Sequence, residues 1–310
     1  MVALRRHFRK ELLDKSLVED NIRSSLAIFN RRIINFDGET CWLNVTIQML
    51  LCAMDYSPHH TMYSTLGKEL LSAQTLDCID SRTIKFLLQS EIESNATRFQ
   101  DILTGYQDTR DALIILGENS QSWPDVYDLI FHTTQSSVTC HSCESKSEGG
   151  AIIQKLYTEI ICPDNNSNLK NELEKLFNQG EDIEYRCESC GILGSSTKKE
   201  QIITEGSSGY LVICVKRSEE SYGNQLKATD DVNFIDSNGF PRTYTPISII
   251  FHRGGIEPRA GSIRHYLCDV KSKYDQRWYR TSDESLPEVL DEPSVTKMGY
   301  VILYRQKFHN

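Results

Sequence analysis

A cysteine at the start of a predicted helix is the first residue of this chain that points to chemistry. After Cys41, apolar residues recur at positions 43, 47, 50, 51 and 54, the spacing of a helix with one buried face. Gly38 and Thr40 precede it and suit a turn that leads into a helix. Unpaired backbone N–H groups and the helix dipole favour thiolate there, so we predict a nucleophile with a lowered pKa. The alternative from this stretch alone is a buried structural cysteine, because free cysteine is among the most buried residue types.

Two pairs of cysteines have the spacing of metal-binding turns. They are Cys140 with Cys143 and Cys187 with Cys190. Two such turns can supply four thiolates in the tetrahedral geometry of a zinc site. The alternatives are two unrelated pairs or a redox dithiol, although a redox motif needs only one pair and a βαβ setting. We predict a structural zinc site, since four sulfur ligands leave no position open for substrate or water.

The elements that must position these residues change character along the chain. Helical patterns cover residues 4–32 and most of residues 43–118. From about residue 133 strand-like runs dominate, and the continuous apolar run at residues 210–215 is typical of a central strand. A small helix is expected at residues 169–177. Further strands are expected at residues 135–139, 151–161, 247–251, 264–270 and 300–304. Helices followed by strands predict an α+β fold.

Residues 218–245 differ from the segments on either side. They are rich in Ser, Asn, Asp and Gly and hold few apolar residues. A polar stretch of this length is typical of a flexible surface insertion or a functional lid.

Charge and composition exclude several classes of protein. The chain has 310 residues, with 34 Lys and Arg against 43 Asp and Glu and a net charge of −9. This balance argues against a nucleic-acid binder, including a zinc-ribbon type, because such proteins need excess positive charge to displace counterions. No run approaches the ~18 apolar residues that a membrane span requires.

The N-terminal residues and the cysteine count bear on the compartment. Residues 1–10 are basic and lack a long apolar run, so no signal peptide is predicted. A mitochondrial presequence is the alternative, although acidic residues follow at positions 11, 14, 19 and 20. With ten cysteines and no signal peptide, we expect a reducing compartment, the cytoplasm or the nucleus.

The residues around Cys41 also resemble a known motif. The stretch reads Gly38-Glu39-Thr40-Cys41-Trp42-Leu43-Asn44 and is followed by Gln48. It resembles the Cys box of the ubiquitin-specific proteases, a papain-like family that removes ubiquitin from proteins. Further boxes resembling those of this family follow in the family's order and together span most of the chain.

The resemblance implies a base and an orienting partner for Cys41. His265 opens a predicted strand and, with Tyr266, resembles the family's His box, which implies that it is the general base. Downstream, Ser282 holds the position where the family usually has Asn or Asp as the third triad member. A minority of the family carries serine there, so the resemblance extends to a Cys-His-Ser triad. Asp283 follows and is expected to supply the missing charge, directly or through a water; alternatively it is a solvated loop carboxylate.

Two positions near the catalytic residues depart from the family's pattern. The family commonly has Asn five residues before the nucleophile, where this chain has Phe36. Asn35 lies one residue further back and serves as the oxyanion donor only if the loop holds an extra residue; the backbone N–H of Cys41 is available in either case. Arg264 replaces the usual Gly before His265.

A third box implies how substrate is recognised. Residues 106–113 resemble the family's Gln-Asp-x-x-Glu-Phe box, with Asp111 where Glu is usual. The resemblance implies that Asp108 and Asp111 contact the arginine-bearing tail of ubiquitin, about one helical turn apart on one face. Without the other boxes, a solvated helix face would be the simpler interpretation. Tyr266 of the His box is also expected to contact substrate.

Together these resemblances imply one papain-like, α+β catalytic domain over residues 1–310. Within it we expect a helical extension at residues 1–30, a thumb at 31–132, zinc-binding fingers at 133–205 and a palm at 206–310. The predicted activity is thiol-dependent hydrolysis of isopeptide or peptide bonds after the terminal Gly-Gly of ubiquitin. Expected partners are ubiquitin, polyubiquitin chains and ubiquitinated proteins, and the expected state is a monomer.

Two alternative functions remain open at this stage. One is an isopeptidase for a ubiquitin-like modifier such as SUMO or an interferon-induced homologue, because Trp42 is not the family's commonest residue after the nucleophile. The other is a catalytically weak ubiquitin-binding module, which Phe36 and Arg264 favour and the intact Cys41 and His265 oppose.

Overall fold

The computed structural model describes most of the chain from residue 32 onward. The described residues are 32–35, 40–76, 78–94, 108–147, 152–162, 167–217, 226–253, 265–283, 285–293 and 299–307. Phe36, Arg264 and nearly all of the helix expected at residues 4–32 lie outside them. Arg32, the last residue of that expected helix, instead opens strand β1. Among the described residues, no helix is both long enough and apolar enough to cross a membrane.

The helical part of the chain surrounds one buried helix. Its helices are α2 (Cys41–Tyr56), α3 (Thr65–Gln74), α4 (Arg82–Ser94), α5 (Thr109–Glu118) and α6 (Pro124–Ile130). Every residue of α2 from Cys41 to Met54 is buried, because α3, α5 and α6 surround it on one side and a sheet covers the other. The helical prediction for residues 43–118 is thus confirmed where it can be seen, except for β2 (Cys78–Asp80), which pairs in parallel with β1 (Arg32–Ile34).

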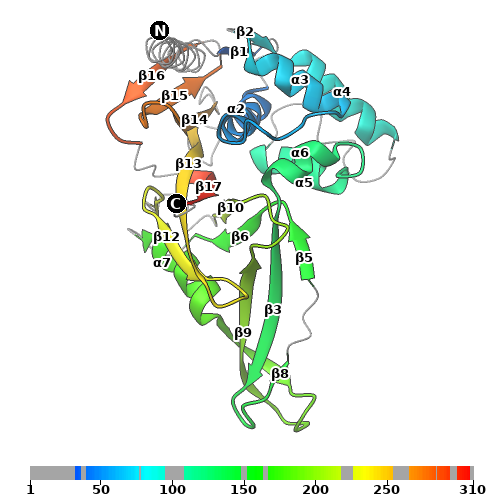
Figure 1. Ribbon diagram of the computed structural model, residues 1–310, viewed down its shortest axis with the longest axis vertical. Helices are drawn as coiled ribbons and strands as arrows, with labels where there is room; N and C mark the ends of the chain where they lie inside the picture. Colours follow the sequence, from blue (N-terminus) through cyan, green and yellow to red (C-terminus); the bar gives the residue numbers. More distant parts are fainter. Residues whose placement is uncertain are drawn as a thin grey trace, which may run out of the picture.

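An eight-stranded sheet packs against this helical part (Figure 1). Its order is β16-β15-β14-β13-β17-β10-β6, and β12 pairs separately with β13. The strands are β6 (Thr158–Ile161), β10 (Tyr210–Lys216), β12 (Val232–Ile235), β13 (Pro241–Arg253), β14 (His265–Lys271), β15 (Trp278–Ser282), β16 (Ser285–Leu290) and β17 (Gly299–Gln306). All neighbours are antiparallel apart from β10 and β6.

The sequence of β10 is apolar without interruption because both faces of the strand are buried. Val212 and Cys214 face the core that contains α2, whereas Leu211 and Ile213 face a second core built around α7 (Leu169–Glu174). A strand covered on both faces has no solvent-facing position, so the usual alternation disappears. The α+β class is confirmed, and the strand predictions are confirmed for the described residues.

A second, five-stranded sheet extends away from the helices (Figure 1). Its order is β4-β3-β9-β8, with β5 paired to β3. The strands are β3 (His132–Cys140), β4 (Lys146–Ser147), β5 (Ile152–Lys155), β8 (Glu181–Arg186) and β9 (Leu193–Ile203). The π-helix η1 (Lys175–Gln179) continues α7 and leads into β8, and a short parallel pair joins β7 (Ser167–Asn168) to β11 (Leu226–Lys227).

The prediction that residues 218–245 form a flexible insertion or lid is wrong for residues 226–245; residues 218–225 lie outside the described range. This segment contains β11, β12 and the start of β13. Val232, Phe234 and Tyr244 are buried in the core with α7. The Phe234 ring lies 4.9 Å from that of Tyr244 and 5.1 Å from that of Phe177, measured between centroids. Two inward-facing residues suffice for a four-residue strand, so a low apolar content did not exclude one.

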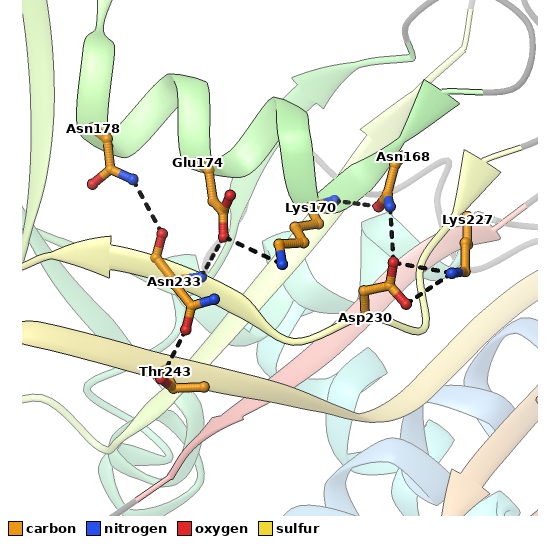
Figure 2. A network of polar contacts seen from close by, with 8 residues as sticks. All are labelled: Asn168, Lys170, Glu174, Asn178, Lys227, Asp230, Asn233 and Thr243. Atoms are coloured by element: carbon orange, nitrogen blue, oxygen red, sulfur yellow. Dashed lines mark hydrogen bonds and ion pairs between the residues drawn. The ribbon is translucent and has the colours of Figure 1, made fainter.

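Polar side chains of α7 and η1 bind the backbone of β12 in the same segment (Figure 2). Glu174 accepts a hydrogen bond from the backbone N–H of Asn233 at 2.8 Å, and Asn178 donates to its carbonyl at 3.1 Å. Asn178 also accepts from the backbone N–H of Ile235 at 3.0 Å. These side chains satisfy the N–H and carbonyl of Asn233 and the N–H of Ile235, which makes this strand less available for pairing with another chain.

Candidate active site and metal centre

Cys41 is the first residue of α2, as predicted, but its electrostatic environment is not the predicted one. The side chain is 2% exposed. Burial raises the pKa of the Cys41 thiol above its ordinary value, and the backbone of Tyr266 opposes this by hydrogen bonding. The negative charge of Asp283 raises the pKa further, while the backbone N–H groups at the helix start lower it. The predicted lowered pKa is therefore wrong, because desolvation disfavours the thiolate more than the helix terminus favours it.

His265 and Ser282 are in direct contact, as the predicted pairing requires. His265 opens β14 and Ser282 ends β15, and these two strands are antiparallel neighbours. His265 Nε2 lies 2.8 Å from Ser282 Oγ. Because the backbone of Tyr266, the next residue, reaches Cys41, the sheet brings the histidine and the cysteine into one cluster.

Asp283 lies in the same cluster and is not a solvated loop carboxylate. One carboxylate oxygen, Oδ1, accepts a hydrogen bond from Asn44 Nδ2 at 2.8 Å. The other, Oδ2, accepts from Asn35 Nδ2 at 2.9 Å and lies 3.7 Å from His265 Nδ1. The backbone of Asp283 has φ +39°, in the left-handed region, and its carbonyl accepts from the N–H of Ile33 at 3.0 Å.

Asn35 joins the start of α2 to this cluster. Its Oδ1 accepts from both the backbone N–H and the hydroxyl of Thr40, at 3.1 and 2.8 Å. With its Nδ2 donating to Asp283, the side chain bridges the residue before Cys41 and the carboxylate. An oxyanion role for Asn35 stays a prediction.

The two carboxylates expected to bind substrate also cap helix α5. Asp108 is the N-cap residue and accepts from the backbone N–H of Arg110 at 2.8 Å, while Asp111 accepts from the backbone N–H of Asp108 at 3.2 Å. Tyr300 donates its hydroxyl to Asp108, and burial raises the pKa of Asp111. Both carboxylates are thus engaged within the protein in a reciprocal capping box rather than displayed on a solvated face. Their substrate role stays a prediction.

Tyr266 is half-buried between the helical part and the sheet. Its ring packs edge-on to that of His252, 4.8 Å away, and lies 6.3 Å from that of Tyr300. Burial raises the pKa of its hydroxyl, with the charge of Asp108 contributing. Through Tyr300 and Tyr266, the α5 cap is connected to the Cys41 cluster.

The four predicted metal ligands meet at the tip of the five-stranded sheet. Cys140 ends β3 and Cys143 lies on the turn that follows, and Cys187 and Cys190 lie on the turn between β8 and β9. In each turn the first cysteine accepts a backbone hydrogen bond from the residue four positions later, and that residue has a positive φ: Glu144 at +58° and Gly191 at +71°. The register of β3, β9 and β8 holds these matching turns side by side.

The sulfur atoms at this tip are spaced to hold a metal ion. All four lie within 4.8 Å of one another, with Cys140 to Cys190 at 4.0 Å and Cys143 to Cys187 at 3.7 Å. Tetrahedral coordination with metal–sulfur bonds of about 2.3 Å places sulfurs about 3.8 Å apart. The hydroxyl of Ser145 and backbone N–H groups lower the pKa of Cys187 to about 6, which favours the thiolate that a metal requires.

Sequence reasoning missed Asn44, Tyr300 and Ser145 as members of these sites. Ser145 and Tyr300 carry no signal of these contacts, because only the tertiary fold brings them to Cys187 and Asp108. Asn44 did carry one: it is a polar residue three positions after Cys41, on the same side of a helix that is mostly apolar.

Comparison with known proteins gives relatives both in sequence and in fold. No family model matches the chain. Ubiquitin carboxyl-terminal hydrolase 25 of Arabidopsis thaliana is 32% identical over 176 residues, which are 51% of this chain and 25% of that protein. The chain therefore spans about a quarter of the length of this curated relative.

Solved structures of Ubp8 in the SAGA DUB module with Sgf11, Sus1 and Sgf73 match over most of the chain. The complex with monoubiquitin has a TM-score of 0.63 at 18% identity, covering 91% of this chain and 71% of the other. The complex with ubiquitin aldehyde has a TM-score of 0.60 at 16% identity, covering 90% and 70%. The chain thus has the fold of Ubp8, and about half of it is similar in sequence to a ubiquitin carboxyl-terminal hydrolase.

Proposed function

We propose that this protein is a deubiquitinase, a cysteine peptidase that hydrolyses isopeptide or peptide bonds after the terminal Gly-Gly of ubiquitin. The observation that carries the proposal is the cluster at the start of α2. It holds Cys41, whose sulfur is hydrogen-bonded by the backbone of Tyr266, the residue after His265. It also holds His265, whose Nε2 lies 2.8 Å from Ser282 Oγ. A nucleophile, a base and an orienting group in one cluster are the requirements of acyl transfer.

The contacts of the imidazole assign its two nitrogens. Nε2 faces Ser282, so Nδ1 is the nitrogen that takes the thiol proton of Cys41 and later gives it to the leaving amine. In the neutral base, Nε2–H donates to the Ser282 hydroxyl, which fixes this tautomer. Asp283, 3.7 Å from Nδ1, favours the imidazolium that forms. Burial raises the pKa of the Cys41 thiol, and in this proposal the proton passes to His265 as the sulfur attacks the carbonyl carbon.

The same proposal assigns the remaining predicted residues. Asp108 and Asp111, anchored at the start of α5, would bind the basic tail of ubiquitin beside Tyr266. Ubiquitin, polyubiquitin chains and ubiquitinated proteins would be the partners, and thumb, fingers and palm would occupy residues 31–132, 133–205 and 206–310. Zinc would be the metal at the four cysteines, since its tetrahedral thiolate coordination suits this donor set.

The direct test is covalent capture by ubiquitin carrying a thiol-reactive group at its C-terminus. Wild-type protein should form one adduct with the ubiquitin probe, mapped to Cys41 by peptide mass spectrometry. Matched probes based on SUMO and an interferon-induced modifier should give little or none. Capture by another modifier alone would reassign the substrate. No capture by any probe, with the protein folded, would contradict a peptidase activity.

Replacing Ser282 tests the orienting role. Ser282→Ala should lower kcat/KM on a fluorogenic ubiquitin amide by on the order of 10²-fold, because the imidazole loses the contact that fixes its proton. Ser282→Asn should retain activity, since an amide can accept the same bond and Ser282 lines an open cavity of about 470 Å³ with room for it.

Asp283→Ala is the matched comparison for Ser282→Ala, with thermal melts to confirm that each variant is folded. Full activity in Ser282→Ala together with a large loss in Asp283→Ala would transfer the third triad position to Asp283. Strong loss in both variants would mean that serine and aspartate act together on His265.

A further inference from the structure

Asn44 is one of three buried polar residues in the first half of α2, together with Thr46 and Gln48. It lies three residues after Cys41, on the same side of the helix, and is 1% exposed. Burying a side-chain amide is costly unless its groups are hydrogen-bonded. Its Nδ2 donates to Asp283 at 2.8 Å, and its Oδ1 has no hydrogen-bond partner among the described residues. Within the described part of the chain, the hydrogen bond of this side chain is therefore directed at the carboxylate.

The Asp283 carboxylate is held from two sides by two amides. Asn44 binds Oδ1 from α2, and Asn35 binds Oδ2 from the residue after β1. The main chain is fixed as well, through the carbonyl contact with Ile33 and a φ of +39° that few residues other than glycine adopt. A carboxylate restrained at both oxygens cannot rotate away from His265 Nδ1, which lies 3.7 Å from Oδ2.

We propose that Asn44 is a positioning residue for the reaction: its amide, opposite that of Asn35, holds the Asp283 carboxylate against His265 Nδ1 and beside Cys41. This inference rests on the proposed function for its effect on turnover. In this role Asn44 acts through Asp283 and not directly on the reacting atoms. Without its amide, Oδ1 loses its buried donor and the carboxylate turns toward solvent, where water replaces the bond.

A double-mutant cycle separates this role from a purely structural one. Asn44→Ala should lower kcat/KM on a ubiquitin amide by between about 10- and 100-fold, the range for a misplaced catalytic group. In an Asp283→Ala background the same change should cost less than about 2-fold, because no carboxylate remains to be positioned. Thr46→Val is the matched control: Thr46 is equally buried on α2 but bonds the helix carbonyl of Trp42, so its activity should match wild type.

The reactivity of Cys41 gives a second readout that needs no ubiquitin. The titratable groups facing one another here are Cys41 on α2, His265 and Tyr266 on β14, and Asp283 after β15. The charge of Asp283 raises the pKa of Cys41, so moving it away lowers that pKa. The pH midpoint of Cys41 alkylation by iodoacetamide, followed by peptide mass spectrometry, should therefore shift down in Asn44→Ala and Asp283→Ala. The double variant should shift no further than Asp283→Ala, and Thr46→Val should not shift.

These measurements decide between a positioning role and a purely structural role for Asn44. Equal losses from Asn44→Ala in both backgrounds, or an unchanged alkylation midpoint, would overturn the positioning role. The expected alkylation shifts in a protein that hydrolyses no ubiquitin substrate would leave the positioning role standing and remove the proposed function. If Asn44→Ala does not fold, Asn44→Ser keeps a small polar group at the site and carries the same expectations.

Discussion

Cys41→Ala should abolish turnover of a fluorogenic ubiquitin amide while leaving ubiquitin affinity unchanged. Removing a nucleophile typically costs on the order of 10⁴-fold or more in kcat. Only the sulfur is lost, from a side chain that is 2% exposed, so the surface that would contact ubiquitin keeps its shape. The measurements are kcat/KM on the amide and Kd for free ubiquitin by calorimetry.

Cys52→Ala is the control for this change, since Cys52 is a second buried cysteine of α2 whose sulfur contacts the carbonyl of Ile247. This variant should melt earlier, because it leaves a small cavity, yet keep its activity. Turnover by Cys41→Ala close to that of wild type would show that another residue is the nucleophile.

Loss of one ligand at the metal centre should have the largest effect on stability. Cys187→Ser should lower Tm by about 10 °C or more, or give insoluble protein, since metal-binding free energy is folding free energy at such sites. Elemental analysis should find one zinc per wild-type chain and little in the variant. Cys78→Ser, a change at an exposed cysteine away from the four ligands, should melt as wild type does. Zinc-free wild-type protein with an unchanged Tm would contradict the assignment.

The sequence predicted elements whose pattern is set by local burial. The helix after Cys41 and the strand at residues 210–215 were visible because nearly every residue in them is buried. The metal ligands were visible because their spacing is itself the signal. The raised pKa of Cys41 could not be predicted from the sequence, because it depends on β14 covering the thiol. That contact joins residues more than 200 positions apart in the chain.

At two other places the sequence carries two competing patterns, and the less obvious pattern describes the structure. Asp108 and Asp111 have the spacing of a capping box as well as that of two neighbouring carboxylates on a helix face. Residues 226–245 combine turn-forming side chains with a period-two pattern of only a few apolar residues, and the composition outweighed the period. In both cases a partner distant in the sequence decides which pattern the structure follows. That partner is Tyr300 for the two carboxylates and α7 for residues 226–245.

The stability of the five-stranded sheet depends little on buried side chains. Along β8 and β9 few side chains are buried, and Ser196 and Ile202 are the fully buried residues of β9. A sheet with so little core depends on its backbone ladder and on whatever joins the strands at the far end. Joining Cys140 to Cys190 through a metal closes a loop of about fifty residues, which removes chain entropy from the locally unfolded state rather than adding contacts to the folded one. Metal occupancy, more than hydrophobic packing, would then set how rigid a surface this arm of the molecule presents.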